Sequence, residues 1–129
     1  RAEAAAFAGF WQEAVAAYDL DPARITVLGY SNGANFAGAV MALHPGLIAR
    51  AILMRPMLAL DPVPEADLTG LRVLTLEGAR DPYGVHAPAL NDWLAASGAD
   101  LDARRLPAGH ELSPDDLVAA TAWLGRIVD

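Results

Sequence analysis

The first segment of the chain, residues 2–18, is rich in alanine and carries large apolar side chains at three- and four-residue steps. This spacing predicts an amphipathic helix. We expect its aromatic stripe to pack in the core rather than to hold a cofactor. The stripe comprises Phe7, Phe10, Trp11, Val15 and Tyr18.

Short apolar runs follow, separated by segments of helical periodicity. The runs predict strands at 25–30, 51–57, 73–76 and 101–106, the last of which alternates as an edge strand does. Helices are predicted up to about residue 43, over about 87–97, and from 113 to about 128. The inner face of the last helix is predicted to consist of Leu117, Trp123, Leu124 and Ile127. Strands separated by helices imply an α/β fold, with a mostly parallel sheet and helices on both faces.

The strand at 25–30 enters the next helix through a G-x-S-x-G motif, in which Ser31 lies between Gly29 and Gly33. In this setting the turn strains the serine backbone and brings strand and helix so close that only small residues fit beside it. The motif therefore predicts that the Ser31 hydroxyl is a nucleophile at a helix N-terminus. The alternative is that Ser31 only caps the helix, since serine is a favoured N-cap residue.

Two further polar residues follow predicted strands at the same edge of the sheet. Asp81 comes just after the third strand, and His110 just after the fourth. A serine nucleophile needs an imidazole to accept its proton, and the imidazole needs a carboxylate to fix its tautomer. The chain order Ser31, Asp81, His110 is the α/β-hydrolase order, so we predict nucleophile, acid and base in that sequence. Asp81 before a proline is also typical of a simple Asx turn.

Other residues compete for the roles of base and acid. His44 lies about three turns along the helix from the serine and is better explained as a cation at the helix C-terminus. His86 shares a loop with the predicted acid and is a second candidate base. Asp61 is the main rival acid, whereas Asp92 and Asp100 are more typical of solvated positions.

The groups around the predicted nucleophile suggest how an ester would be held. The backbone amide of Asn32, which follows the serine, is the expected oxyanion donor. The second donor normally comes from an earlier loop, and no HGGG-like segment precedes Ser31 in this sequence. Met57 and Tyr83, on loops after strands, are candidate walls of the substrate pocket, although both also fit ordinary core or loop roles.

Composition excludes several other classes of function. The net charge is −7, and the nine basic residues, all arginine, are scattered rather than gathered into a stripe for nucleic acid. No apolar run is long enough to span a bilayer, and the histidines and carboxylates show no HExxH-like spacing for a metal. No cofactor is expected. The absence of cysteine suits a cytoplasmic protein, and the excess of Ala, Arg, Asp and Gly suggests a GC-rich bacterial genome.

Four segments together resemble bacterial serine carboxylesterases of the phospholipase/carboxylesterase branch of the α/β-hydrolase superfamily, close to dienelactone-hydrolase-like enzymes. They read GYSNGANFAGAVMALHP, AILMRPMLAL, VLTLEGARDP and PAGHELSPDDLVAATAWL. The resemblance implies that Ser31, Asp81 and His110 form a catalytic triad. Dienelactone hydrolases proper carry a cysteine nucleophile, so the serine here favours ester hydrolysis.

The resemblance also implies further strands and a glycine-rich oxyanion loop before residue 1. We therefore expect residues 1–129 to be one α/β-hydrolase domain truncated at its N-terminus, with the rest supplied by a longer chain, another segment or another subunit. A homodimer is a separate expectation for the assembly. The predicted activity is hydrolysis of small-molecule carboxylic esters, or thioesters, through an acyl-enzyme. The alternative is a non-catalytic binding or scaffold module that keeps only the fold.

Overall fold

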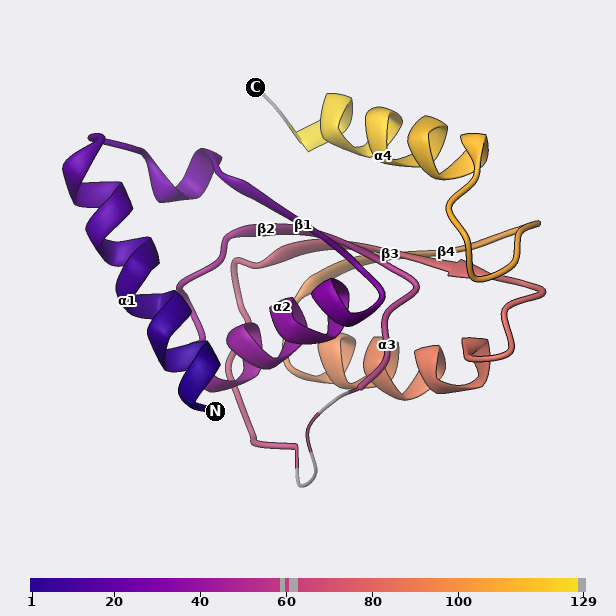
Figure 1. Ribbon diagram of the computed structural model, residues 1–129, viewed down its shortest axis with the longest axis horizontal. Coiled ribbons are helices and arrows are strands. Elements are labelled where there is room, and N and C mark those ends of the chain that lie inside the picture. The colour runs from indigo at the N-terminus through magenta and orange to yellow at the C-terminus, as the bar shows by residue number, and fades with distance from the viewer. Residues whose placement is uncertain (59, 61–62, 128–129) are drawn as a thin grey trace.

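A four-stranded parallel sheet forms the centre of the computed structural model, which describes residues 1–58, 60 and 63–127 (Figure 1). Its strands are β1 (Thr26–Tyr30), β2 (Arg50–Met54), β3 (Arg72–Gly78) and β4 (Asp100–Leu106). They lie side by side in chain order, and each neighbouring pair is parallel. The carboxyl ends of all four strands therefore meet at one edge of the sheet, as the sequence predicts.

Helices cover both faces of the sheet, which confirms the predicted fold class (Figure 1). The helices are α1 (Ala2–Ala17), α2 (Asn32–Leu43), α3 (Ala87–Ala96) and α4 (Pro114–Ile127), with short 3₁₀ turns at Pro22–Arg24 and Gly84–His86. Helices α2 and α3 pack on one face, α1 packs beside α2, and α4 lies on the other face. Within the described residues, no helix is both long and apolar enough to cross a membrane.

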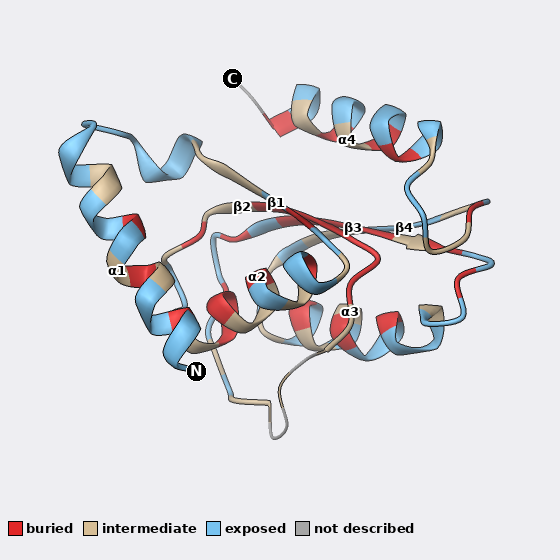
Figure 2. Ribbon diagram, in the orientation of Figure 1, coloured by how far each residue is buried: buried red, intermediate tan, exposed pale blue. Residues whose placement is uncertain are grey.

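Two apolar clusters fill the spaces between the sheet and its helices, and Figure 2 shows buried residues concentrated on the central strands. The larger cluster lies under α1, α2 and α3 and includes Trp11, Val40, Met41, Leu53, Val73, Leu90 and Leu94. The smaller cluster lies under α4 and comprises Ile52, Met54, Leu74, Leu76, Ala119, Trp123 and Ile127. Adjacent residues of β2 and β3 thus point into opposite clusters, as the two-residue period of a strand requires.

The predicted core stripe of the first helix is only partly correct. Trp11 is buried, but Phe10 is 64% exposed and Tyr18 is 75% exposed. The buried residues of the helix are Ala4, Ala8 and Trp11, at helical spacing, and Phe7 and Val15 are partly buried against the same cluster. The exposed Phe10 and Tyr18 lie off that face.

Two details at the second strand and the last helix also differ from the prediction. Strand β2 ends at Met54 rather than at residue 57, because Arg55 adopts a positive φ of 54° that the extended ladder does not permit. In α4, Leu117 is 71% exposed, and the inward position of the first turn belongs to the buried Asp116. The predicted end of this helix at residue 128 lies outside the described residues.

An ion pair between the residue after β2 and the first turn of α4 explains the inward position of the Asp116 carboxylate. The guanidinium of Arg55 and the carboxylate of Asp116 form two hydrogen bonds of 2.8 Å, and the two side chains are 0% and 4% exposed. Asp116 Oδ2 also accepts hydrogen bonds from the backbone amide and the hydroxyl of Ser113 at the start of α4. Burial favours the neutral acid, but the hydrogen bonds from Arg55 and Ser113 outweigh it and lower the pKa of Asp116.

The carboxyl end of β3 lies unusually close to the loop that follows β4. A β-carbon built on Gly78 would lie 2.3 Å from the carbonyl oxygen of Gly109 and 2.6 Å from that of Ala108. Only glycine permits this approach of two backbones. Gly78 therefore brings the segment after β3 against the loop after β4.

We expect the substitution Gly78→Ala to lower the free energy of unfolding by about 1–3 kcal/mol, because the methyl group meets backbone that has no rotamer to change. Urea denaturation of both proteins measures this loss. The control is Gly9→Ala in α1, where an added β-carbon has no described neighbour within 4 Å. This control should gain up to about 1 kcal/mol from helix propensity, and equal stability of Gly78→Ala and the parent would contradict the prediction.

We expect Asp116→Asn to lower the free energy of unfolding by about 3 kcal/mol at pH 6, since the buried Arg55 loses its counter-charge. Folding lowers the pKa of Asp116 from 3.8, so its stabilising contribution is complete above about pH 5 and is lost as the pH falls through the folded-state pKa. The stability difference between parent and variant should therefore shrink in urea titrations below about pH 4.

Asp102→Asn is the matched control, because Asp102 pairs with Arg104 and Arg126 at partly exposed positions. Its effect should stay within about 1 kcal/mol at every pH. A stability loss in Asp116→Asn that does not change between pH 6 and pH 3 would mean that the charge of this carboxylate is not what stabilises the fold.

Candidate active site

Ser31 occupies the sharp turn between β1 and α2, with φ 55° and ψ −114°. This backbone conformation is strained for a residue with a side chain. A β-carbon on Gly29 would lie 2.8 Å from backbone atoms of Gly33 and Ala34, so the close approach of strand and helix requires that first glycine. The second glycine is different, because a β-carbon on Gly33 would have no described neighbour within 4 Å. The prediction that only small residues fit on either side of the serine therefore holds at Gly29 but not at Gly33.

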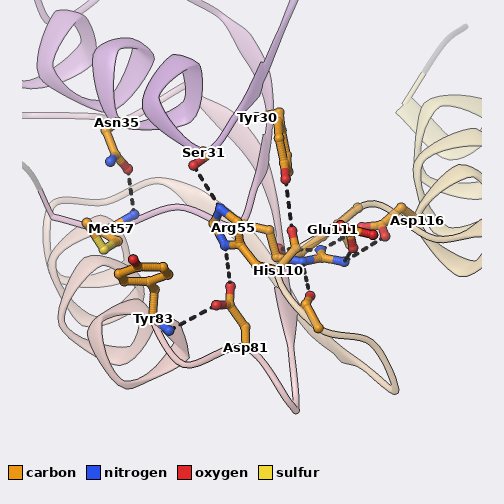
Figure 3. Close-up of polar contacts among 12 residues, drawn as sticks. Tyr30, Ser31, Asn35, Arg55, Met57, Asp81, Tyr83, His110, Glu111 and Asp116 are labelled. Atoms are coloured by element: carbon orange, nitrogen blue, oxygen red, sulfur yellow. Dashed lines mark hydrogen bonds and ion pairs between the residues drawn. The ribbon is translucent and has the colours of Figure 1, made fainter.

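The Ser31 side chain does not cap the helix that it begins. Its hydroxyl makes no capping hydrogen bond to α2, and Oγ lies 3.0 Å from Nε2 of His110 (Figure 3). The contact spans from the first strand to the loop after the last strand. The capping alternative therefore does not describe this serine.

Asp81 lies on the opposite side of the same imidazole. Its Oδ2 is 2.9 Å from Nδ1 of His110, and its side chain is 3% exposed (Figure 3). Its Oδ1 accepts a hydrogen bond of 2.9 Å from the amide of Tyr83, so the residue also forms the Asx turn that its sequence suggests. The two interpretations of Asp81 are compatible, because each uses a different oxygen.

The protonation of this pair follows from its contacts. Burial raises the pKa of Asp81, but hydrogen bonds from His110 and from the Tyr83 amide, with the nearby Arg55 charge, lower it below the ordinary value of 3.8. An ionised carboxylate only accepts hydrogen bonds, so Nδ1 of His110 carries the proton that it donates to Asp81. Nε2 is then free to accept the hydroxyl proton of Ser31.

Side chains from two strand ends hold the loop that carries His110 (Figure 3). Arg55 donates from Nε to the carbonyl oxygen of Gly109 at 2.8 Å and from Nη2 to that of Glu111 at 3.0 Å. The hydroxyl of Tyr30 donates to the carbonyl oxygen of His110 itself at 3.1 Å. Three consecutive carbonyl groups of the loop are therefore bound by side chains.

A hollow of about 390 Å³ opens beside the serine and the histidine. It is lined by Ser31, Asn32, Asn35, Arg55, Met57, Tyr83 and His110. The two predicted wall residues both lie there, and the ring of Tyr83 packs edge-on against His110 with 5.3 Å between ring centroids. The amide of Met57 donates to Oδ1 of Asn35 at 2.7 Å, which fixes the backbone after β2.

Asn32, the predicted oxyanion donor, is the first residue of α2 and lines the same hollow. The first amides of a helix have no partner within it, and the helix dipole favours negative charge at this end. The amide of this residue therefore lies at the positive end of α2, beside the hollow that Ser31 also lines.

The competing candidates lie elsewhere. His44 follows the end of α2, near the amino ends of the strands, and His86 is exposed in the 3₁₀ turn before α3. Asp92 and Asp100 are exposed, and Asp61 lies outside the described residues. Among the residues that the structure describes, no three His, Asp or Glu side chains gather as a metal-ligand set.

Sequence reasoning missed three residues of the site: Tyr30, Asn35 and Arg55. Tyr30 occupies a variable position of the motif, and Asn35 looks like a polar residue on an otherwise apolar helix. The one available signal was Arg55, a charged residue in the apolar run AILMRPM directly before a proline. A charge in a buried strand needs a partner, but the sequence does not say which one.

The chain is 46% identical to a carboxylesterase from Mesorhizobium loti, and the two structures superpose with a TM-score of 0.92 over 96% of this chain and 60% of that one. A carboxylesterase from Bacillus cereus gives 26% identity and a TM-score of 0.89, over 95% of this chain and 59% of that one. The protein MhqD of Bacillus subtilis (strain 168), named as a putative hydrolase, is 29% identical over 116 residues, 88% of this chain and 58% of that protein.

No protein-family model matches the chain. The matched proteins are longer, since the chain spans only 58–60% of their length. The similarity nevertheless extends over nearly all of this chain, which confirms the resemblance drawn from its motifs. The chain therefore has the α/β-hydrolase fold and is related to carboxylesterases of that fold.

Proposed function

We propose that this chain carries the reacting groups of a serine hydrolase that cleaves carboxylic esters, or thioesters, through an acyl-enzyme. The observation that carries the proposal is the line of contacts from Ser31 Oγ through His110 to Asp81, at 3.0 Å and 2.9 Å. Both distances fall in the range needed for proton transfer from a nucleophile to a base that a third group orients. The similarity to two carboxylesterases supports the same class of substrate.

In the first half of the reaction, Nε2 of His110 accepts the hydroxyl proton of Ser31 while Oγ attacks the acyl carbon. The negative charge that develops on the carbonyl oxygen is stabilised by the Asn32 amide at the start of α2. Asp81 stabilises the imidazolium that forms. The imidazolium then donates its proton to the leaving alcohol or thiol, and the acyl group remains bound to the serine oxygen.

In the second half, a water molecule enters from the hollow beside the serine. His110 accepts its proton as it attacks the acyl-enzyme, and the returning proton restores the Ser31 hydroxyl when the carboxylic acid leaves. A hollow of about 390 Å³ suits a small-molecule ester.

The non-catalytic alternative makes a different structural prediction. A module that keeps only the fold has no need to hold a serine hydroxyl against an imidazole, and would tolerate a buried serine or a histidine turned away. The Ser31–His110 contact and the strained backbone of the serine both favour the enzyme.

Covalent labelling with a fluorophosphonate tests the nucleophile directly. We expect intact mass to increase by one adduct and peptide mapping to place it on Ser31, because the adjacent imidazole activates that hydroxyl. Both the 129-residue chain and the protein purified from its natural source should be treated. Ser31→Ala is the control and should remain unlabelled. If folded protein from the natural source does not react, the hydrolase proposal is wrong.

Asp81→Asn tests the orientation of the base. Asparagine can form a similar contact but favours the other imidazole tautomer, so the labelling rate at Ser31 should fall by about 10³–10⁴-fold. Asp92→Asn, at an exposed position of α3, is the matched control and should react at the parent rate. Equal rates for Asp81→Asn and the parent would show that this carboxylate does not orient His110.

A further inference from the structure

Arg55 uses its whole guanidinium group inside the protein. Its five N–H donors make five hydrogen bonds: to the backbone oxygens of Leu76, Gly109 and Glu111, and to both carboxylate oxygens of Asp116. The residue is 3% exposed. A side chain with every donor satisfied in a buried site has a single accessible orientation, and it transmits that orientation to its partners.

The backbone of Arg55 is also unusual. Its φ of 54° lies in the left-handed region, which is unfavourable for a residue with a long side chain. This conformation ends β2 and aims the side chain across the carboxyl end of β3 toward the loop after β4. Strain of this kind persists only where surrounding contacts compensate for it.

We propose that Arg55 is a positioning residue for the catalytic base: its guanidinium grips the carbonyl groups on both sides of His110 and so fixes the imidazole between Ser31 and Asp81. The proposal rests on the function proposed above. The two hydrogen bonds flank the base, since Gly109 immediately precedes His110 and Glu111 immediately follows it.

Asp116 compensates the positive charge of Arg55. An unpaired cation close to the imidazole would oppose formation of the imidazolium during the reaction. The bidentate pair with Asp116 compensates the Arg55 charge and fixes the plane of the guanidinium. Arg55 therefore holds the loop without leaving a free positive charge beside the base.

Arginine is required because the two loop carbonyls and the two carboxylate oxygens must be bound at once by one rigid, planar group. Lysine keeps the charge but presents a single nitrogen, so it cannot bind both sides of His110. In Arg55→Lys we expect the first-order rate of Ser31 labelling at saturating fluorophosphonate to fall by about 10²-fold, because a misplaced base slows the chemical step.

Nuclear magnetic resonance of the ¹⁵N-histidine-labelled chain reports the position of His110 independently of any reaction at Ser31. The proton on Nδ1 of His110, bonded to Asp81, should give a downfield signal in the parent. In Arg55→Lys this signal should be lost or shifted. If the parent shows the signal but fails to label, the hydrolase function is wrong, and the spectrum of Arg55→Lys still decides the positioning role.

A second variant separates the effect of positioning the His110 loop from the effect of the Arg55 charge, and it is expected to remain folded. Arg55→Met combined with Asp116→Leu replaces a buried ion pair by apolar side chains, a change that proteins often tolerate without loss of stability. This double variant removes both charges and the two hydrogen bonds to the loop. It should therefore show the same slow labelling and altered His110 signal as Arg55→Lys. Circular dichroism melts confirm that each variant is folded.

Arg126→Lys is the matched control. Arg126, on α4, also pairs with an aspartate, Asp102, and its described hydrogen bond goes to that residue rather than to the His110 loop. This variant should keep the parent labelling rate and spectrum. If either folded Arg55 variant retains the parent His110 signal, or labels Ser31 at the parent rate, the positioning role is overturned.

Discussion

The buried positive charge of Arg55 is the constraint on which the arrangement of the site depends. A cation that is wholly out of water must have each of its donors satisfied, or the fold loses several kcal/mol. The partners of this guanidinium belong to β3, to the loop after β4 and to α4. These three elements are therefore held in one relative arrangement by a single side chain at the end of β2.

Close backbone packing at two glycines brings the elements of the site together, and the contacts of Arg55 then hold them in place. Gly29 lets α2 approach β1, which places the Ser31 hydroxyl above the sheet edge. Gly78 lets the loop after β4 approach the end of β3, which brings His110 to the segment that carries Asp81. In both places a methyl group would separate two backbones that the site requires in contact. The close approaches at Gly29 and Gly78 and the hydrogen bonds of Arg55 therefore act at the same edge of the sheet.

The sequence predicts the parallel sheet well because its signals are local. Each strand is a short apolar run, and the G-x-S-x-G turn is contained within five residues. The errors arise where tertiary pairing overrides a local pattern. Leu117 was expected to face the core, but the neighbouring Asp116 takes that place to meet Arg55. Phe10 was expected in the core, but the buried face of α1 is formed by Ala4, Ala8 and Trp11, and Phe10 lies off that face. The catalytic roles of the site residues remain predictions.

The three groups proposed to react are held by contacts of different range, and this difference explains which of them the sequence specifies best. Ser31 is set by its own strained turn, and Asp81 by a hydrogen bond from an amide two residues away. The backbone of His110 is instead held by side chains 54 and 80 positions from the carbonyls they bind. No local pattern encodes such contacts, and the sequence left His86 open as a second candidate base, just as it left Asp61 open as a rival acid. The position of the base also depends on the ion pair between Arg55, after β2, and Asp116 of α4. The base is therefore the group most sensitive to any change that weakens the packing between β2 and α4.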